Sequence, residues 1–154
     1  MPSMSRSAPS TVSAATIVSS LLTVQTPGPG FTDLTAETAK FVRDAGAREG
    51  AVTLFIRHTS ASLTIQENAD PSVLDDLMTA LDGFAPENAG WSHDSEGPDD
   101  MPAHVKTMLT ATSLQVPVLN GRLALGTWQA VYLIEHRRRP HRREIVLQFV
   151  GATA

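Results

Sequence analysis

The feature that most constrains the fold is a run of three strand patterns in the last third of the chain, with no helical pattern between them. These apolar and β-branched segments cover 113–118, 130–135 and 144–150. Asn120-Gly121, just after the first segment, is a residue pair that strongly favours a tight hairpin turn. Strands that follow one another in this way are not typical of a regular β-α-β series, so the sequence predicts an α+β fold.

The first two thirds of the chain mix strand and helix patterns. Strands are predicted at 16–26, around Phe31 and Leu34, at 51–57 and at 63–66. We expect one helix capped by Thr35, one that begins at the cap Asp70 with Pro71 in its first position, and one capped by Asp99 or Asp100. The expected core is a compact mixed or antiparallel β-sheet with about three helices.

Apolar periodicity predicts which faces of the second and third helices are buried. In the second helix the expected buried stripe is Val73, Leu74, Leu77, Met78 and Leu81. In the third helix it is Val105, Met108 and Leu109, with Lys106 outside. Both helices are therefore expected to pack an apolar stripe against the body of the domain.

A length of 154 residues suits one domain, which we place at 16–151. Residues 1–15 are rich in Ser, Ala and Pro, and we expect them to form a disordered tail. They lack the apolar segment of a secretory signal, and no apolar run in the chain approaches the roughly 18 residues of a membrane span. We therefore expect a cytoplasmic protein without a membrane partner.

Composition narrows the chemistry further. The formal net charge is −4, whereas nucleic-acid-binding domains are usually basic, so we expect no nucleic-acid partner. The chain has no cysteine, which excludes disulfides, thiolate metal sites and cysteine nucleophiles. Any transition metal must therefore bind to His, Asp or Glu.

The loop from Trp91 to His104 is the strongest candidate for a functional site. It carries two of the five histidines and four carboxylates: His93, His104, Asp94, Glu96, Asp99 and Asp100. A segment so rich in imidazole and carboxylate is costly to hold in one conformation unless something binds it, and a divalent metal takes both groups as ligands. The alternative is a solvated acidic loop with two surface histidines.

Three further segments carry groups that suit binding or catalysis. His58 follows a predicted core strand and is either a ligand or a hydrogen-bonded residue at the strand end. Arg142 and Arg143 close a basic turn, 136–143, that either clamps a phosphate or keeps a hairpin tip soluble; we favour the hairpin tip for most of its arginines. Gln129 brings an amide to the start of an apolar strand, where it lines a polar pocket or faces solvent.

Several of these segments together resemble the YjbQ-like family, whose members are often described as secondary thiamine-phosphate synthases. The resemblance rests on four blocks: His58-Thr-Ser-Ala-Ser-Leu-Thr-Ile-Gln-Glu-Asn68, His93 with Glu96-Gly97 and Ala103-His104, Ser113-Leu114 to Val118, and Gly121-Arg-Leu-Ala-Leu-Gly-Thr-Trp-Gln129. It extends from about Ile17 to Gly151, nearly the whole chain. The basic turn 136–143 departs from the shorter acidic turn of many members.

The resemblance implies a compact α+β fold, a homotrimer and a pocket lined by the His58 segment and the two loop histidines. The metal ligands that it implies are His58, His93 and His104, for zinc or magnesium, with an open position as in catalytic sites. Glu96 and Gln129 are the implied acid/base or orienting groups that act with His58. Arg142 and Arg143 are candidates for binding an anion.

The description of the family implies an enzyme that joins a pyrimidine diphosphate to a thiazole phosphate and releases pyrophosphate. Its expected partner is therefore a small phosphorylated molecule, and cations or a metal must stabilise the leaving pyrophosphate. Two alternatives stay open. One is a non-enzymatic trimeric protein that binds a metal or a small molecule, and the other is a metal-assisted hydrolase.

Overall fold

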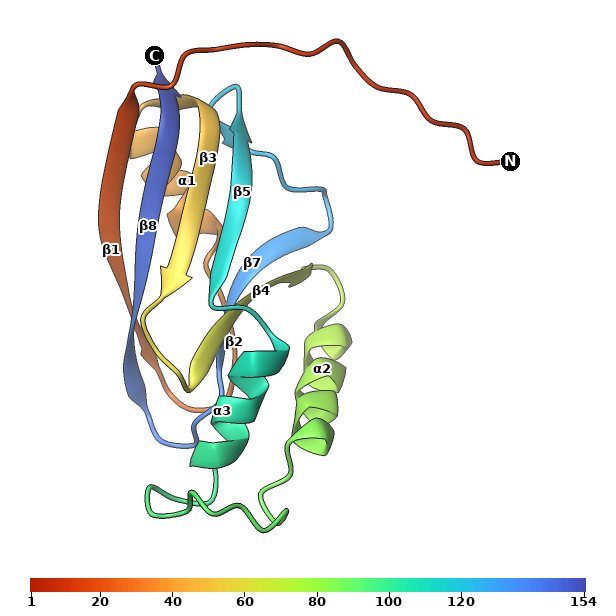
Figure 1. The fold of residues 1–154 in the computed structure, drawn as a ribbon, viewed down its shortest axis with the longest axis vertical. Coiled ribbons are helices and arrows are strands. Elements are labelled where there is room, and N and C mark those ends of the chain that lie inside the picture. Colours follow the sequence, from red (N-terminus) through yellow and green to blue (C-terminus); the bar gives the residue numbers. More distant parts are fainter.

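The computed structural model describes residues 1–154 and divides the chain between two sheets and three helices (Figure 1). The strands are β1 (Thr16–Thr26), β2 (Gly30–Asp33), β3 (Ala47–Ile56), β4 (Ala61–Glu67), β5 (Ser113–Leu119), β6 (Arg122–Leu123), β7 (Gln129–Glu135) and β8 (His141–Thr153). The helices are α1 (Thr35–Asp44), α2 (Pro71–Phe84) and α3 (Asp100–Leu109). The predicted α+β class is confirmed, and β3 and β8 extend beyond the predicted segments.

The larger sheet has the strand order β1-β8-β3-β5-β6 and the smaller one β2-β7-β4. Every pair of neighbouring strands is antiparallel. The fully buried apolar side chains come from α1 and from both sheets, and include Val42, Leu54, Leu63, Leu133 and Phe149. The core therefore lies where α1 and the two sheets meet, and Figure 1 shows α1 behind the larger sheet.

Local signals explain several element boundaries. The Asp70 carboxylate accepts a hydrogen bond from the main-chain N–H of Ser72 at 2.9 Å, which caps α2 as predicted. Asn120 and Gly121 have φ angles of 49° and 74°, in the left-handed region that a tight hairpin turn requires. Thr35, in contrast, is the first residue of α1 and not its cap. Its hydroxyl oxygen accepts a hydrogen bond from the main-chain N–H of Val131, which fastens α1 to β7.

The predicted inner face of α2 is the face that turns from solvent, but it is only half-buried. Val73, Leu74, Leu77, Met78 and Leu81 are half-buried, and every other residue of α2 is exposed. Figure 1 shows the helix beside the body of the molecule. In α3 the predicted faces are reversed, because Met108 and Leu109 are exposed whereas Lys106 is 7% exposed. The Lys106 ammonium binds Asp82 at 2.5 Å. A lysine can bury its methylene stem while its charge reaches a partner, so polarity alone does not place it outside.

Residues 1–15 form no helix or strand and extend away from the domain (Figure 1). Their predicted disorder stays a prediction, as does the 16–151 domain boundary. None of the three helices combines the length and apolar character needed to cross a membrane.

Candidate metal centre

Two histidines and one carboxylate meet where the acidic loop runs into α3. One ligand atom from each of His93, Asp100 and His104 lies within 4.8 Å of the other two. His93 Nε2 and His104 Nε2 lie 2.6 Å and 3.2 Å from the same oxygen, Asp100 Oδ2. The Asp100 side chain is 4% exposed, and those of His93 and His104 are 41% and 31% exposed. The Asp100 carboxylate is therefore the buried member of this cluster, and the two imidazoles are partly exposed to solvent.

The hydrogen bond at His104 Nδ1 determines whether Nε2 of the same ring carries a proton or a lone pair. Nδ1 lies 2.8 Å from the main-chain carbonyl oxygen of Thr59, which only accepts hydrogen bonds, so Nδ1 carries a proton. In the neutral ring Nε2 then has a lone pair directed at Asp100 Oδ2. Two lone pairs at 3.2 Å repel each other unless a proton or a metal ion lies between them. The cluster is therefore arranged to hold positive charge, and a carbonyl on the other ring nitrogen is the usual support of a metal-bound histidine.

Arg137 ties the start of α3 to the segment after β7. Its Nε donates to Asp99 Oδ2 at 2.9 Å, its Nη1 donates to Asp100 Oδ1, and its Nη2 donates to the main-chain oxygen of Glu96. Asp99 and Asp100 therefore bind an arginine, and neither side chain caps α3 as predicted. Burial would raise the pKa of Asp100, but the hydrogen bond from His93 and the charge of Arg137 hold that pKa below its ordinary value. Asp100 is thus an anion at neutral pH.

Glu96 lies at the outer edge of the cluster. Its Oε2 is 3.1 Å from His93 Nε2, and its side chain is 65% exposed. The hydrogen bond with Asp100, together with the charges of Asp100 and Glu96, raises the pKa of His93 above its ordinary value. The structure thus places Glu96 beside a cluster histidine, and its acid/base role stays a prediction.

A cavity of about 410 Å³ opens beside the cluster. Its lining combines loop residues 95–99 with Arg137, Arg138 and Arg139. The Arg138 guanidinium binds Glu87, and Arg139 has no carboxylate within 4.0 Å. The space next to the cluster is therefore lined by three arginines together with Glu96 and Asp99. Arg138, Arg139 and Arg142 are exposed, in agreement with the solvated hairpin tip expected for most arginines of the turn.

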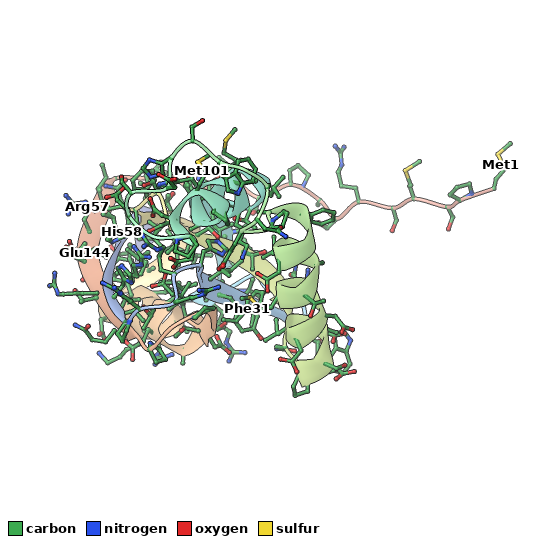
Figure 2. The ribbon with its side chains drawn as sticks, turned by 90° about the horizontal axis from the view of Figure 1, so that it is seen from below. Met1, Phe31, Arg57, His58, Met101 and Glu144 are labelled. Atoms are coloured by element: carbon green, nitrogen blue, oxygen red, sulfur yellow. The ribbon has the colours of Figure 1, made fainter.

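His58 does not join the cluster, in contrast to the predicted set of three histidines. Its Nε2 accepts a hydrogen bond from the main-chain N–H of Glu144 at 2.8 Å, and its Nδ1 lies 3.4 Å from Arg143 Nη1. Figure 2 shows His58 beside Arg57 and Glu144. Burial and the positive charge of Arg143 lower the pKa of His58. Nε2 is occupied by the hydrogen bond from β8, so the neutral ring carries its proton on Nδ1, beside the Arg143 guanidinium. The geometry thus favours the other role considered for His58, a hydrogen-bonded residue at a strand end.

The two arginines predicted to bind an anion have different surroundings. Arg142 is 59% exposed and its guanidinium lies 3.8 Å from the Glu144 carboxylate. Arg143 is buried and forms a two-point ion pair with Glu135, with Nε···Oε1 at 2.8 Å and Nη2···Oε2 at 2.5 Å. The charge of Arg143 is therefore already balanced inside the protein, and the structure gives it a structural role in place of the predicted anion site.

Gln129 lies at the opposite end of β7 from the cluster. Its Oε1 accepts a hydrogen bond from the main-chain N–H of Gly126 at 2.8 Å, and its side chain lines a separate cavity near α1 and β6. A strand rises about 3.3 Å per residue, so β7 separates Gln129 from Glu135 by roughly 20 Å. The structure therefore does not bring Gln129 to the histidines.

Asp100 is absent from the predicted ligand set, although the sequence contains a signal for it. Asp100 and His104 are four residues apart in a predicted helix, a spacing that puts both side chains on one face. His136 is a second residue that the sequence did not single out. It is 3% exposed, its Nε2 lies 2.8 Å from Ser62 Oγ, and its Nδ1 has no partner. Nothing in the local pattern around His136 distinguishes it from the rest of the basic turn.

Comparison with known proteins identifies the family. Residues 20–152 match the family model described as UPF0047 protein YjbQ-like. The chain belongs to this family. The UPF0047 protein sll1880 of Synechocystis sp. is 47% identical over 132 residues, which are 85% of this chain and 90% of that protein. YugU of Bacillus subtilis is 36% identical over 121 residues, 77% of this chain and 88% of that protein.

Solved structures of relatives share the YjbQ-like fold. An uncharacterised conserved YjbQ/UPF0047 protein from Clostridium acetobutylicum has a TM-score of 0.78 at 35% identity, over 84% of this chain and 98% of that one. The conserved hypothetical protein TT1486 from Thermus thermophilus has a TM-score of 0.74 at 38% identity, over 82% of this chain and 97% of that one. The family resemblance inferred from the sequence is confirmed. These relatives are described by family and not by a reaction.

Proposed function

We propose that this YjbQ-like protein is a metal-dependent enzyme that acts on a small phosphorylated molecule. The observation that carries the proposal is the single oxygen, Asp100 Oδ2, that faces two imidazole nitrogens. Two imidazoles and one carboxylate form a donor set that suits zinc or another first-row divalent metal. Magnesium fits this set less well, because it prefers oxygen ligands.

His93, Asp100 and His104 would hold the metal, which when bound would polarise a phosphate oxygen or activate a water molecule. The other residues of the centre support these three. Arg137 keeps Asp100 ionised and in place, and the Thr59 carbonyl keeps the Nε2 lone pair of His104 directed at the centre. Glu96 stands at the open edge, where an exposed carboxylate can accept a proton from a reacting group.

The reaction that we propose is the thiamine-phosphate synthase reaction implied by the family resemblance. A carbon–nitrogen bond forms between the pyrimidine and thiazole units while the carbon–oxygen bond to the diphosphate breaks. The electron pair of the broken bond leaves with pyrophosphate, whose charge needs cations nearby. Arg138 and Arg139, in the cavity beside the cluster, support this assignment, because arginine matches phosphate geometry.

We also propose that the chain works as a homotrimer, in the cytoplasm. The apolar side of α2 is only half-buried within one chain. Nearby apolar side chains are exposed as well, with Phe84 at 71%, Met108 at 88% and Leu109 at 55%. Apolar surface gathered in this way is typical of a contact between subunits. The number of subunits rests on the family resemblance.

Elemental analysis of the untagged protein by mass spectrometry tests the metal. We expect nearly one zinc or other divalent ion per chain in the wild type and loss of that ion in Asp100→Asn. Asp94→Asn is the matched control, because it removes the same charge from the same loop outside the cluster. Absence of metal from the wild type after zinc is added back, or equal retention by both variants, would contradict the metal centre.

Incubation of the metal-loaded protein with the pyrimidine diphosphate and the thiazole phosphate tests the reaction. We expect thiamine phosphate and pyrophosphate in equal amounts from the wild type and from Asp94→Asn, and neither from Asp100→Asn. Phosphate release from the diphosphate alone would identify a metal-assisted hydrolase. Bound metal without any product would point to the non-enzymatic binding protein.

A further inference from the structure

A second cavity lies away from the metal centre and is larger than the one beside it, with a volume of about 630 Å³. Pockets of this size hold small organic ligands. Its walls come from α1, the start of β3 and the turn between β5 and β6. Figure 1 places these elements at the end of the molecule opposite α3. The proposed reaction makes no use of this cavity.

Three arginines from three different elements line this cavity: Arg43 on α1, Arg48 on β3 and Arg122 on β6. None of them has a carboxylate within 4.0 Å. Most of the 12 Lys and Arg side chains do have such a partner, and the exceptions are Arg6, Arg43, Arg48, Arg122 and Arg139. In an acidic chain, three of the five unpaired cations thus line one cavity, where all three are exposed and free to bind an anion.

The rest of the lining combines apolar side chains with the polar residues Thr35, Asn120 and Gln129 and with Ala154. Val42 is fully buried at the wall, and Leu123 and Leu125 are half-buried beside it. The Gln129 side-chain oxygen accepts a hydrogen bond from the Gly126 N–H, and its NH₂ group is free to donate to a ligand. Glu49 is close by, but its carboxylate accepts a hydrogen bond from the Asn120 N–H and is not part of the lining.

We propose that this cavity binds a small organic phosphate. The arginines hold the phosphate group, because a guanidinium offers paired N–H donors that match phosphate oxygens and three unpaired cations suit a doubly charged group. The apolar portion of the ligand lies against Leu123 and Leu125, and the Gln129 NH₂ group donates to it or to the phosphate. In this proposal the Gly126-Thr-Trp-Gln129 turn positions the Gln129 side chain in the lining of the cavity. The site is separate from the metal centre and does not rest on its chemistry.

Isothermal titration with phenyl phosphate at low ionic strength tests the proposal, with inorganic phosphate as the comparison. We expect a site that binds phenyl phosphate more tightly than phosphate, and at least tenfold weaker binding at this site in Arg48→Gln and in Arg122→Gln. Arg6→Gln is the matched control, because it removes an unpaired arginine from the N-terminal segment, and it should bind like the wild type. His93→Ala should also bind like the wild type, which separates this site from the metal centre.

Three results would overturn the proposal: no binding of phenyl phosphate, unchanged affinity in both cavity variants, or the same loss in Arg6→Gln as in Arg48→Gln. Unfolding midpoints of all variants check that each is folded. As a second measurement on the wild type, the Gln129 side-chain amide signals in the NMR spectrum should shift as phenyl phosphate is added. Shifts confined to the acidic loop would place the ligand at the other end of the molecule and refute the assignment.

Discussion

Replacing Glu135 by glutamine removes one charge of a buried pair while keeping the size of the side chain. Glu135 and Arg143 have side chains that are 1% and 4% exposed. Glu135 accepts hydrogen bonds from Arg143, from the Thr26 hydroxyl, and from the main-chain N–H groups of His136 and Arg137. Each carboxylate oxygen accepts at least two of these bonds, so an amide NH₂ in either position faces at least two donors.

We expect Glu135→Gln to lower the free energy of unfolding by about 3 to 5 kcal/mol, the range for leaving one partner of a buried ion pair without its counter-charge. Urea unfolding followed by circular dichroism at one fixed chain concentration measures this change. Asp44→Asn is the control, because it breaks the Lys40–Asp44 pair, whose side chains are 59% and 62% exposed, and should leave stability nearly unchanged. A loss below about 1 kcal/mol with an unchanged urea dependence would refute the reasoning, because the pair would then contribute no more than an exposed one.

The Glu135–Arg143 pair also predicts that the stability of the fold depends on pH in the acid range. Burial alone would raise the pKa of Glu135, but the hydrogen bonds and charge of Arg143 and the Thr26 hydroxyl hold it below its ordinary value of 4.5. A carboxyl group with a lowered pKa in the folded state stabilises the fold above its unfolded pKa, and this stability is lost as the pH falls further. Wild-type stability should therefore drop more steeply below pH 4.5 than that of Glu135→Gln.

Three shorter predictions follow from other residues. Burial lowers the pKa of His136 from 6.5 to about 4, so the unfolded chain binds a proton at this residue before the folded chain does. As the pH falls from 6.5 to 4, the free energy of unfolding should therefore decrease by about 3 kcal/mol. Unfolding curves of His136→Gln should lack this decrease. A Cβ on Gly50 would lie 2.2 Å from the Val150 carbonyl oxygen, whereas one on Gly83 would meet nothing within 4 Å. Thermal melts should therefore show Gly50→Ala destabilised by at least about 1 to 3 kcal/mol and Gly83→Ala no less stable than the wild type. Met108→Glu, at an 88% exposed position, should leave the fold of the chain intact and break the proposed trimer, as measured by sedimentation velocity.

The parts of the fold that the sequence predicted are those decided by local chemistry. Asp70 caps α2 and Asn120-Gly121 forms a turn because each acts on main-chain atoms within two or three residues. The buried face of α3 was wrong because it depends on Asp82, which is distant in the chain and binds Lys106. Periodicity shows which residues share a helix face, but it does not show which other segment that face meets.

In the candidate site, too, the sequence predicted what depends on nearby residues and missed what depends on distant ones. His93 and His104 share the acidic loop, and their proximity follows from its short length. His58 and Gln129 were grouped with them through the family resemblance, but strand geometry sends each to a different place. Asp100 was treated as a cap because capping is the common role of an Asp before a helix. Its actual partner, Arg137, is 37 residues away, and no local pattern reports such a contact.

The buried pair and the proposed metal centre are connected through the main chain. Arg143 holds the Glu135 carboxylate, and the same carboxylate accepts the N–H of Arg137, the residue whose guanidinium reaches Asp100. A buried ion pair is often no more stabilising than apolar residues of the same size, so stability alone does not explain its presence. Its geometric effect does, because it fixes the backbone from which Arg137 orders the acidic loop. Glu135→Gln should therefore weaken metal retention as well as stability, whereas a variant equally destabilised through the distant core, such as Val116→Ala, should lose stability and retain the metal.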